Sequence, residues 1–253
     1  TPTGSPTMNC ENINPYTGDS RNKSQQVREM FDNIAPAYDF MNRAMTFGID
    51  RRWRRKAVDG LRDRHPVDIL DVATGTGDLA MLIARRIDGS RITGIDLSEG
   101  MIGIGRKKIA DAGLAGRITL RTADSLAMPF ADDTFDAVTV AYGVRNFENL
   151  LQGYREMLRV LRPGGTLCVI ELATPASPLV RPFYKFYTRC IIPAVGRLVS
   201  KDVRAYSYLP ESIAAVPQRA GMTQLIGQAG FTDASFRSLT FGTCCIYTAV
   251  KPK

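Results

Sequence analysis

Two carboxylates and a pair of glycines are the residues whose types and spacing best predict chemistry. An apolar run ends at Asp71 and passes through a small-residue turn that contains Gly75 and Gly77, after which a helical pattern begins. The glycines let the backbone approach a ligand closely, and the following helix would present its positive N-terminal end. Asp96 closes the next apolar run, with Leu97 beside it. This pattern predicts a nucleotide-type cofactor across the carboxyl edge of a parallel sheet.

The glycine motif on its own fits more than one class of protein. Residues 75–80 also satisfy the G-x-G-x-x-A dinucleotide fingerprint, with Asp96 about 20 residues further on as the ribose acid. A tight strand-to-helix turn without a ligand would show the same glycines. Asp71 separates the cofactor classes, because a diphosphate repels a carboxylate whereas a sulfonium cofactor with an ammonium group tolerates one. The pattern therefore favours S-adenosylmethionine, with Asp71 near the ammonium group or an ordered water.

Each remaining residue of this edge has an expected partner on the cofactor. The Gly75 and Gly77 backbone should approach the methionine part, and Asp96 should accept hydrogen bonds from both ribose hydroxyls. After the following strand, Asp124 should accept a hydrogen bond from the adenine amino group, which leaves the Ser125 backbone for a ring nitrogen. Asp124 alone would also fit a turn residue that caps exposed amides. Carboxylates at three consecutive strand ends favour the cofactor site.

Composition argues against several kinds of site. The 253 residues are 44% hydrophobic and 23% charged, which suits one large α/β domain. A single histidine, His65, argues against a metal centre and against histidine acid–base catalysis. Five cysteines without CxxC spacing fit reduced thiols. No metal is expected.

The formal net charge of +8 is compatible with an anionic partner or with a basic enzyme that is simply soluble. The basic residues are interspersed with acids and lack an aromatic and basic platform, which argues against nucleic acid as a partner. No apolar run approaches the ~20 residues that span a bilayer. The charge alone does not separate an anionic membrane surface from bulk water.

Alternating strand and helix patterns must position these residues. The expected strands cover residues 68–72, 91–95, 118–122, 135–141 and 166–171, and the expected helices cover 78–87, 98–112 and 150–161. Such alternation predicts parallel strands with right-handed crossovers. Strand patterns at 231–239 and 244–250 are too close for a crossover helix, so they predict an antiparallel hairpin. The fold class is therefore α/β and Rossmann-like, with a seven-stranded, mostly parallel sheet and helices on both faces, as in class I methyltransferases.

The flanking segments are expected to be helical or disordered. Residues 1–22 read as a disordered tail, and residues 1–7, which precede Met8, as an expression remnant. Residues 23–253 then form a single domain. Within it, residues 23–62 form an N-terminal helical cap, with two short helices bent at Pro36 and a further helix capped by Asp50. Residues 178–215 form a helical insertion.

Longer strings are more specific than the glycine motif. The chain closely resembles ubiquinone/menaquinone biosynthesis C-methyltransferases from about Val27 to its C-terminus. The resemblance rests on residues 31–39 with Asn42, 48–54, 71–77, 142–146, 162–165 and 206–213. The Tyr38-Asp39 segment and the Gly143-Val144-Arg145-Asn146 string are its most specific parts, whereas the glycine motif is generic to class I methyltransferases that use S-adenosylmethionine.

The resemblance also implies which residues act. Family contacts to the cofactor match Thr74, Asp96, Asp124 and Ser125, whereas a serine that is common at the end of the fourth strand is Ala141 here, so only a backbone contact could survive.

By the same resemblance, Arg145, Asn146 and Tyr38 face the ring of a polyprenyl quinol. A quinone carbon is electrophilic, so the acceptor must be the reduced quinol, whose phenolate places charge on the ortho carbon. Arg145 is a poor base, so it is expected to stabilise the phenolate while Asn146 and Tyr38 orient the ring. A surface salt bridge is the plainer interpretation of Arg145.

The acceptor class remains open at this point. Demethylmenaquinol and a ubiquinol precursor both fit, and another phenolic or lipid acceptor, or a non-catalytic partner in a quinone-biosynthesis assembly, are alternatives. Residues 178–201 combine apolar and basic side chains, a pattern that suits a lipid-tail channel or an anionic membrane, or a core helix with a solvated basic face. We expect a cytoplasmic protein with peripheral contact at the inner membrane face. A homodimer is compatible with the sequence.

Overall fold

The carboxyl ends of five parallel strands form the edge on which the site is built. The computed structural model describes residues 10–191 and 204–253, and in this part seven strands form one sheet in the order β3-β2-β1-β4-β5-β7-β6. Strands β1 to β5 pair in parallel, and β7 runs antiparallel to both β5 and β6. The bounds are β1 (Asp68–Val72), β2 (Arg91–Asp96), β3 (Ile118–Thr122), β4 (Phe135–Ala141), β5 (Leu161–Leu172), β6 (Thr232–Leu239) and β7 (Cys244–Val250). The strand order reverses between β1 and β4, and such a switch point opens a crevice at the carboxyl ends.

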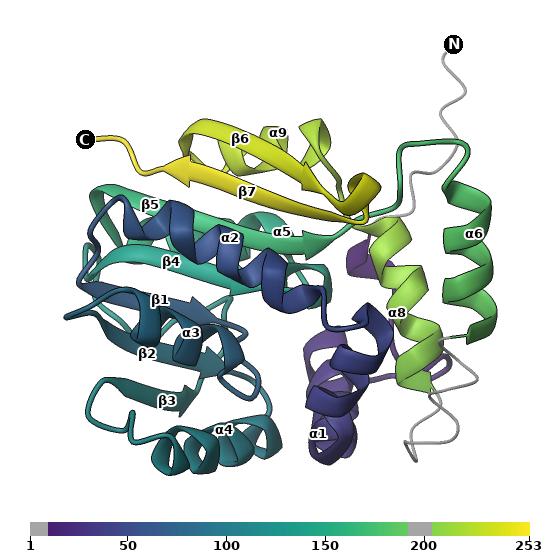
Figure 1. Cartoon of the computed structure of the whole chain (residues 1–253), viewed down its shortest axis with the longest axis horizontal. Helices are drawn as coiled ribbons and strands as arrows, with labels where there is room; N and C mark the ends of the chain where they lie inside the picture. Colours follow the sequence, from purple (N-terminus) through teal and green to yellow (C-terminus); the bar gives the residue numbers. More distant parts are fainter. Residues whose placement is uncertain (1–9, 192–203) are drawn as a thin grey trace.

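Helices cover both faces of the sheet and also stand at its carboxyl edge (Figure 1). One face packs against α2 (Asp50–Arg62), α3 (Asp78–Arg86) and α4 (Glu99–Asp111), the other against α5 (Leu150–Val160) and α9 (Ala220–Gln228). At the carboxyl edge lie α1 (Lys23–Thr46), α6 (Arg181–Phe186) and α8 (Arg204–Ala215). Short turns of helix are η1 (Cys10–Asn12), η2 (Val144–Asn146), the π-helical η3 (Tyr187–Ile191) and η4 (Thr240–Gly242).

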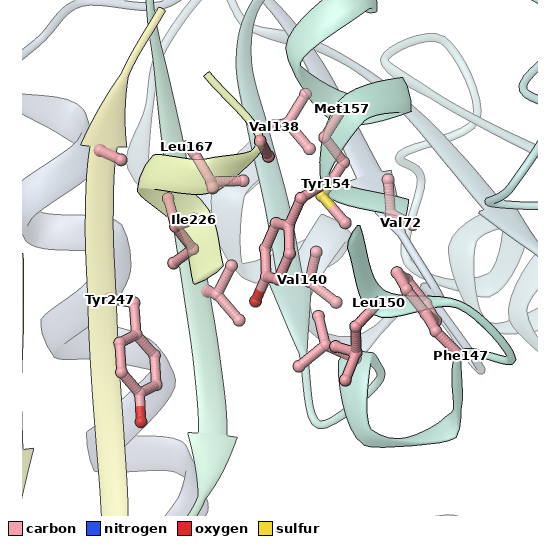
Figure 2. Close-up of a cluster of buried hydrophobic side chains, with 14 of the residues drawn as sticks. Val72, Val138, Val140, Phe147, Leu150, Tyr154, Met157, Leu167, Ile226 and Tyr247 are labelled. Atoms are coloured by element: carbon pink, nitrogen blue, oxygen red, sulfur yellow. The ribbon is translucent and has the colours of Figure 1, made fainter. Parts of the chain in front are cut away.

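A dry core fixes the sheet against α5 and α9. Figure 2 shows Tyr154 and Met157 of α5 against the valines of β4, with Ile226 of α9 beside them. Tyr154 is fully buried, and its hydroxyl lies 3.1 Å from Met222 Sδ. Burial of such side chains supplies most of the stability that holds the strand ends in register.

The predicted fold class is confirmed, including the antiparallel hairpin at the C-terminus. Strands β1, β3 and β4 have the predicted bounds. β2 and β6 differ from the predicted bounds by one residue each, and β5 begins at Leu161, where the end of a helix is predicted, rather than at Thr166. Its pairing with β4 shifts between Phe135 and Ala137, so the Pro-Gly-Gly sequence is absorbed as an irregularity in the strand rather than excluded from it.

The N-terminal region differs from the prediction in two ways. The two short helices expected on either side of Pro36 are one helix, because α1 continues through this proline from Lys23 to Thr46. Proline removes one helical hydrogen bond, but packing of Met30, Ile34 and Met41 in one apolar cluster holds the helix together. Disorder is also wrong for residues 10–22, whereas residues 1–9 lie outside the described residues. Cys10 is fully buried there.

Two further expectations are corrected. Asp50 is not a helix cap but the first residue of α2, and its carboxylate bonds Arg54 one turn on. The helical insertion expected over 178–215 begins later, at Arg181, and α6 passes at Tyr187 into the π-helical η3, while α8 covers Arg204–Ala215. The middle of that insertion, residues 192–203, lies outside the described residues. No helix in the described part of the chain has the length and apolar character needed to cross a membrane.

Candidate functional site

The loop between β1 and α3 lays its backbone against the end of β2. Gly75 has a φ of +58°, a left-handed conformation that favours glycine, and its N–H donates to Asp96 Oδ2 at 2.9 Å. The Ser98 N–H donates to Asp96 Oδ1, also at 2.9 Å. Burial raises the pKa of Asp96, although these backbone hydrogen bonds lower it. The two donors fix the Asp96 carboxylate in one orientation.

A cavity at the carboxyl ends of β1, β2 and β4, here called the cofactor cavity, collects most of the predicted cofactor residues. It is lined by Gly75, Asp96, Leu97, Asp124, Ser125 and Ala141. Asp124 Oδ1 also accepts the Leu126 N–H at 2.8 Å, so this carboxylate caps a turn as well as facing the cavity.

Gly77 does not line the cofactor cavity. A Cβ there would meet Ile109 at 3.4 Å and Leu120 at 3.6 Å, which are ordinary contact distances, so the left-handed φ of +79° rather than close packing favours glycine at this position.

Asp71 lies behind the glycine loop. Its buried carboxylate accepts hydrogen bonds from Thr74 Oγ1 at 2.6 Å and Thr139 Oγ1 at 2.7 Å. Asp71 and Thr74 line a small cavity that shares Gly75 and Ala141 with the cofactor cavity. Burial raises the pKa of Asp71 to about 6, although both hydroxyl hydrogen bonds lower it. Asp71 is therefore close to the cofactor cavity, but its carboxylate already accepts two hydrogen bonds.

The charges of the cofactor cavity decide which cofactor class fits it. Among the described residues that line it, Asp96, Asp124 and Glu148 are acidic and Arg28 is the one basic residue. A diphosphate would meet three carboxylates, whereas ribose hydroxyls, an adenine amino group and a sulfonium cation all find acceptors. The residues fit S-adenosylmethionine, whose ribose Asp96 would hold and whose adenine Asp124 and Ser125 would hold.

A larger cavity, here called the acceptor cavity, adjoins the first and has a volume of about 250 Å³. Its lining is mostly apolar and comes chiefly from α1, α2, α8 and the segment of α6 and η3. Four side chains line both cavities: Phe31, Tyr38, Tyr142 and Asn146. A group that passes from one cavity to the other must cross between these four residues.

Arg145 and Glu171 form a buried ion pair at the acceptor cavity. Arg145 Nη1 donates to Glu171 Oε1 at 2.7 Å and to the Tyr142 carbonyl at 2.5 Å. Glu171 is 1% exposed and Arg145 is 6% exposed, so the surface salt bridge considered for Arg145 is wrong. Burial alone would lower the pKa of Arg145, but the Glu171 carboxylate raises it, so Arg145 is a permanent cation in this cavity.

Asn146 and Tyr38 reach the same cavity from different elements. Asn146 Oδ1 accepts the Tyr208 hydroxyl at 3.2 Å, which leaves its NH₂ group as a donor toward the cavity. Burial raises the pKa of Tyr38, while a hydrogen bond with Asn42 and the charges of Arg145 and Arg54 lower it. Tyr38 is therefore a neutral phenol within electrostatic reach of both arginines. The structure thus brings together Tyr38, Arg145 and Asn146.

Helix α1 is anchored to three loops that carry the site. Asp32 accepts the Ser98 hydroxyl at 2.6 Å, Asp39 accepts the Thr76 hydroxyl at 2.6 Å, and Lys23 donates to the Arg145 carbonyl at 3.2 Å. Each contact joins residues at least 37 positions apart in the chain. The helix therefore holds the loops around both cavities in one arrangement.

Three further residues of the acceptor cavity or its support are not among the predicted site residues: Glu171, Arg54 and Tyr142. Glu171 follows the same rule as Asp71 and Asp96, because it is an acid at the end of a predicted strand. Arg54 and Tyr142 lie in two of the strings that carry the family resemblance, but nothing in their local sequence marks them as site residues, since one lies in a run of basic residues and the other beside the glycine of a loop.

Comparisons with known proteins agree with this geometry. The chain matches the ubiE/COQ5 methyltransferase family over residues 19–251. It is 48% identical to a demethylmenaquinone methyltransferase of Bacteroides fragilis, over 95% of this chain and 98% of the relative. It is also 48% identical to the ubiquinone/menaquinone biosynthesis C-methyltransferase UbiE of Geobacter sulfurreducens, over 90% of each chain.

Among solved structures, the S-adenosylmethionine-dependent methyltransferase SibL in its apo form superposes with a TM-score of 0.59 at 21% identity. The match covers 81% of this chain and 57% of SibL, and it shows a shared fold. With the family match over most of the chain, these findings identify the protein as an S-adenosylmethionine-dependent methyltransferase that belongs to the ubiE/COQ5 methyltransferase family.

Proposed function

We propose that the protein methylates a ring carbon of a polyprenyl quinol, with demethylmenaquinol as its acceptor. The observation that carries this proposal is the acceptor cavity, which is mostly apolar, adjoins the cofactor cavity, and is lined by Arg145, whose charge is held in a buried ion pair with Glu171. A flat apolar ring with a polar oxygen matches such a lining. The names of the relatives, among them a demethylmenaquinone methyltransferase 48% identical to this chain, favour the same acceptor.

The side chains act by orientation and electrostatics. S-adenosylmethionine supplies an electrophilic methyl group when bound. Arg145, kept charged and oriented by Glu171, stabilises negative charge on the ring oxygen next to the reacting carbon. Asn146 donates to the same ring region, and Tyr38 packs edge-on against Phe31 with ring centroids 5.9 Å apart, at the boundary of the two cavities. The apolar walls exclude water from the reacting carbon and align it with the methyl donor.

Transfer of labelled methyl to extracted lipid tests this function. We expect labelled product with reduced demethylmenaquinol and none with the oxidised quinone, because only the quinol can carry a phenolate. A demethylated benzoquinol in parallel shows whether the acceptor class is broader. Transfer to the oxidised acceptor would contradict the mechanism, and binding of S-adenosylmethionine without transfer to any quinol would favour a non-catalytic partner.

The affinity for S-adenosylmethionine should rise with pH as Asp71 ionises. In the folded protein the pKa of Asp71 is about 6, above its ordinary value of 3.8. Between these two pH values the folded state holds a proton that the unfolded state has lost, so the free energy of unfolding falls as pH rises. A cationic cofactor favours the ionised Asp71 carboxylate. Below pH 6, cofactor binding must therefore displace the Asp71 proton, and the affinity for S-adenosylmethionine falls by up to about tenfold per pH unit. Titration calorimetry from pH 5 to 8 measures this change. Asp71→Asn should give a flat profile, and a flat profile in the unaltered protein would remove Asp71 from cofactor binding.

We also propose that the rim of the acceptor cavity contacts an anionic lipid surface. Phe47 is 85% exposed, yet it lines the acceptor cavity, and the centroid of its ring lies 5.9 Å from that of Tyr187. Phe183 and Phe186 of α6 are exposed at 78% and 62%, and the same helix carries Arg181 and Lys185. Exposed aromatics among basic side chains suit the interface of an anionic membrane, and they would let a lipid tail enter without crossing water.

Co-sedimentation with vesicles of anionic lipid tests this surface. The double variant Phe183→Ala/Phe186→Ala should bind at least about tenfold more weakly, because two aromatic rings no longer leave water. Phe236→Ala is the matched control, since Phe236 is 41% exposed on the edge strand β6. Equal binding by both variants would show that α6 does not contact lipid.

A further inference from the structure

Three buried polar atoms without a hydrogen-bond partner belong to residues that line one cavity. In the described part of the chain they are Arg54 Nε, Tyr142 Oη and Arg145 Nε. All three residues line the acceptor cavity. A buried donor without a partner costs free energy, so atoms of this kind that gather at one cavity indicate a ligand that would satisfy them. Arg145 is accounted for by the phenolate, but Arg54 and Tyr142 are not.

Arg54 and Tyr142 form one unit. The guanidinium carbon of Arg54 lies 5.3 Å from the centre of the Tyr142 ring. Arg54 Nη1 bonds Asp50 at 2.8 Å and lies 3.4 Å from Asp78, which also pairs with Lys108. The Arg54 charge is therefore compensated, and its Nε–H remains as a donor. Burial raises the pKa of Tyr142 well above its usual value, so its hydroxyl keeps its proton and can donate as well.

The backbone holds Tyr142 in a conformation that a bulky residue rarely adopts. Its φ is +61°, in the left-handed region, and its N–H donates to the Ile170 carbonyl at 2.8 Å. Strain of this kind persists where the surrounding structure fixes it and is frequent at ligand sites. Here it places the ring where it lines both cavities.

We propose that Arg54 and Tyr142 bind the second ring oxygen of the acceptor, the one remote from the reacting carbon. This inference rests on the proposed function. A dihydroquinone carries oxygens on opposite carbons of one ring, and it needs two separate polar groups to bind them. The hydrogen-bond partners of Arg145 are Glu171 and the Tyr142 carbonyl, whereas those of Arg54 are Asp50 and Asp78, so different carboxylates orient the two guanidinium groups on either side of Tyr142's backbone and ring contacts. The charges of Arg145 and Arg54 both lower the pKa of Tyr38, so this hydroxyl lies within electrostatic reach of both guanidinium groups.

This second oxygen site makes the cavity selective for rings with two para oxygens. A monophenol of the same shape would leave the Tyr142 hydroxyl and Arg54 Nε–H unsatisfied. An unpaired polar group in a binding site discriminates more strongly than a missing methyl group does. The site thus recognises the reduced diol by both of its oxygens, and the apolar walls recognise the rest of the ring.

Tyr142→Phe tests the site with two acceptors that differ by one oxygen. The acceptors are the prenylated naphthalene-1,4-diol and 3-prenyl-1-naphthol, which keeps the hydroxyl next to the reacting carbon. We expect kcat/KM for the diol to fall about tenfold in the variant and kcat/KM for the naphthol to stay within twofold. Because each comparison is made within one acceptor, the difference in ring reactivity cancels.

Two controls separate binding from structure. Tyr142→Phe removes a buried hydroxyl without a partner, so its melting temperature should not fall. Tyr187→Phe changes another tyrosine of the same cavity whose hydroxyl already donates to the Met45 carbonyl at 2.7 Å. Its effect, whatever its size, should be equal for both acceptors.

An equal fall in kcat/KM for both acceptors in Tyr142→Phe would show that the residue only shapes the cavity. An unchanged kcat/KM for both acceptors would show that its hydroxyl does not bind the acceptor. Each result overturns the second oxygen site. Failure of the unaltered protein to methylate the diol would instead overturn the proposed function.

Discussion

Arg145→Ala is expected to lower kcat by about 10²- to 10³-fold while the affinity for S-adenosylmethionine stays the same. A preorganised donor that meets developing charge in a dry cavity is worth about 3–4 kcal/mol in comparable sites. Arg145 meets both conditions, because it is buried and held by Glu171 at 2.7 Å. Arg145→Lys keeps the charge but loses the planar guanidinium group, so its kcat should lie between that of the unaltered protein and that of Arg145→Ala. Single-turnover methyl transfer measures the rate of the chemical step, and calorimetry measures the affinity for S-adenosylmethionine.

Glu171→Gln should reproduce much of this loss, because Glu171 positions Arg145 and holds it charged. Removing one partner of a buried ion pair also destabilises a protein by about 3–5 kcal/mol, so activity is compared below the melting transition of the variant. Arg162→Ala is the control, since Arg162 pairs with Asp136 and Asp68 on a partly exposed surface and such pairs contribute about 0–1 kcal/mol. Full turnover in both Arg145→Ala and Glu171→Gln would place the chemistry elsewhere in the cavity.

The part of the site that the sequence predicts best depends on local rules. Acids at the ends of apolar strands, such as Asp96 and Asp124, are visible because strand and turn patterns extend over only a few residues. The parallel order then brings these strand ends to one edge. Glu171 obeys the same rule and could have been found by it.

The remaining residues depend on contacts between distant segments. Lys23 donates to the Arg145 carbonyl across 122 positions, and Trp53 donates to Thr240 across 187. The spacing of apolar residues does not determine which face of α2 packs near the end of β4. The contact of Arg54 with Tyr142 therefore cannot be predicted from the local sequence. The continuity of α1 through Pro36 has the same origin, because tertiary packing outweighs the local preference of proline.

Gly143→Ala is expected to lower the free energy of unfolding by about 1–3 kcal/mol and to weaken cofactor binding as well. A Cβ at Gly143 would lie 2.5 Å from Ala73 Cβ and 3.1 Å from Val140 Cγ1. Ala73 cannot rotate away, because its Cβ is attached directly to a backbone with a φ of +52°. The strand ends of β1 and β4 must therefore separate, and both Ala73 and Gly143 line the cofactor cavity.

Gly103→Ala is the matched control for this effect. Gly103 lies in α4 with nothing within 4 Å of an added Cβ, so alanine there should leave stability unchanged or raise it by up to about 1 kcal/mol through helix propensity. For a chain of this size, a loss of about 2 kcal/mol lowers the melting temperature by about 4–8 °C. Equal melting temperatures and equal affinities for S-adenosylmethionine in the two variants would contradict the close approach of β1 and β4. If the expected difference appears, the glycine of the Gly143-Val144-Arg145-Asn146 string is explained by packing at the boundary of the two cavities, and the specificity of that string then lies in the residues that follow the glycine.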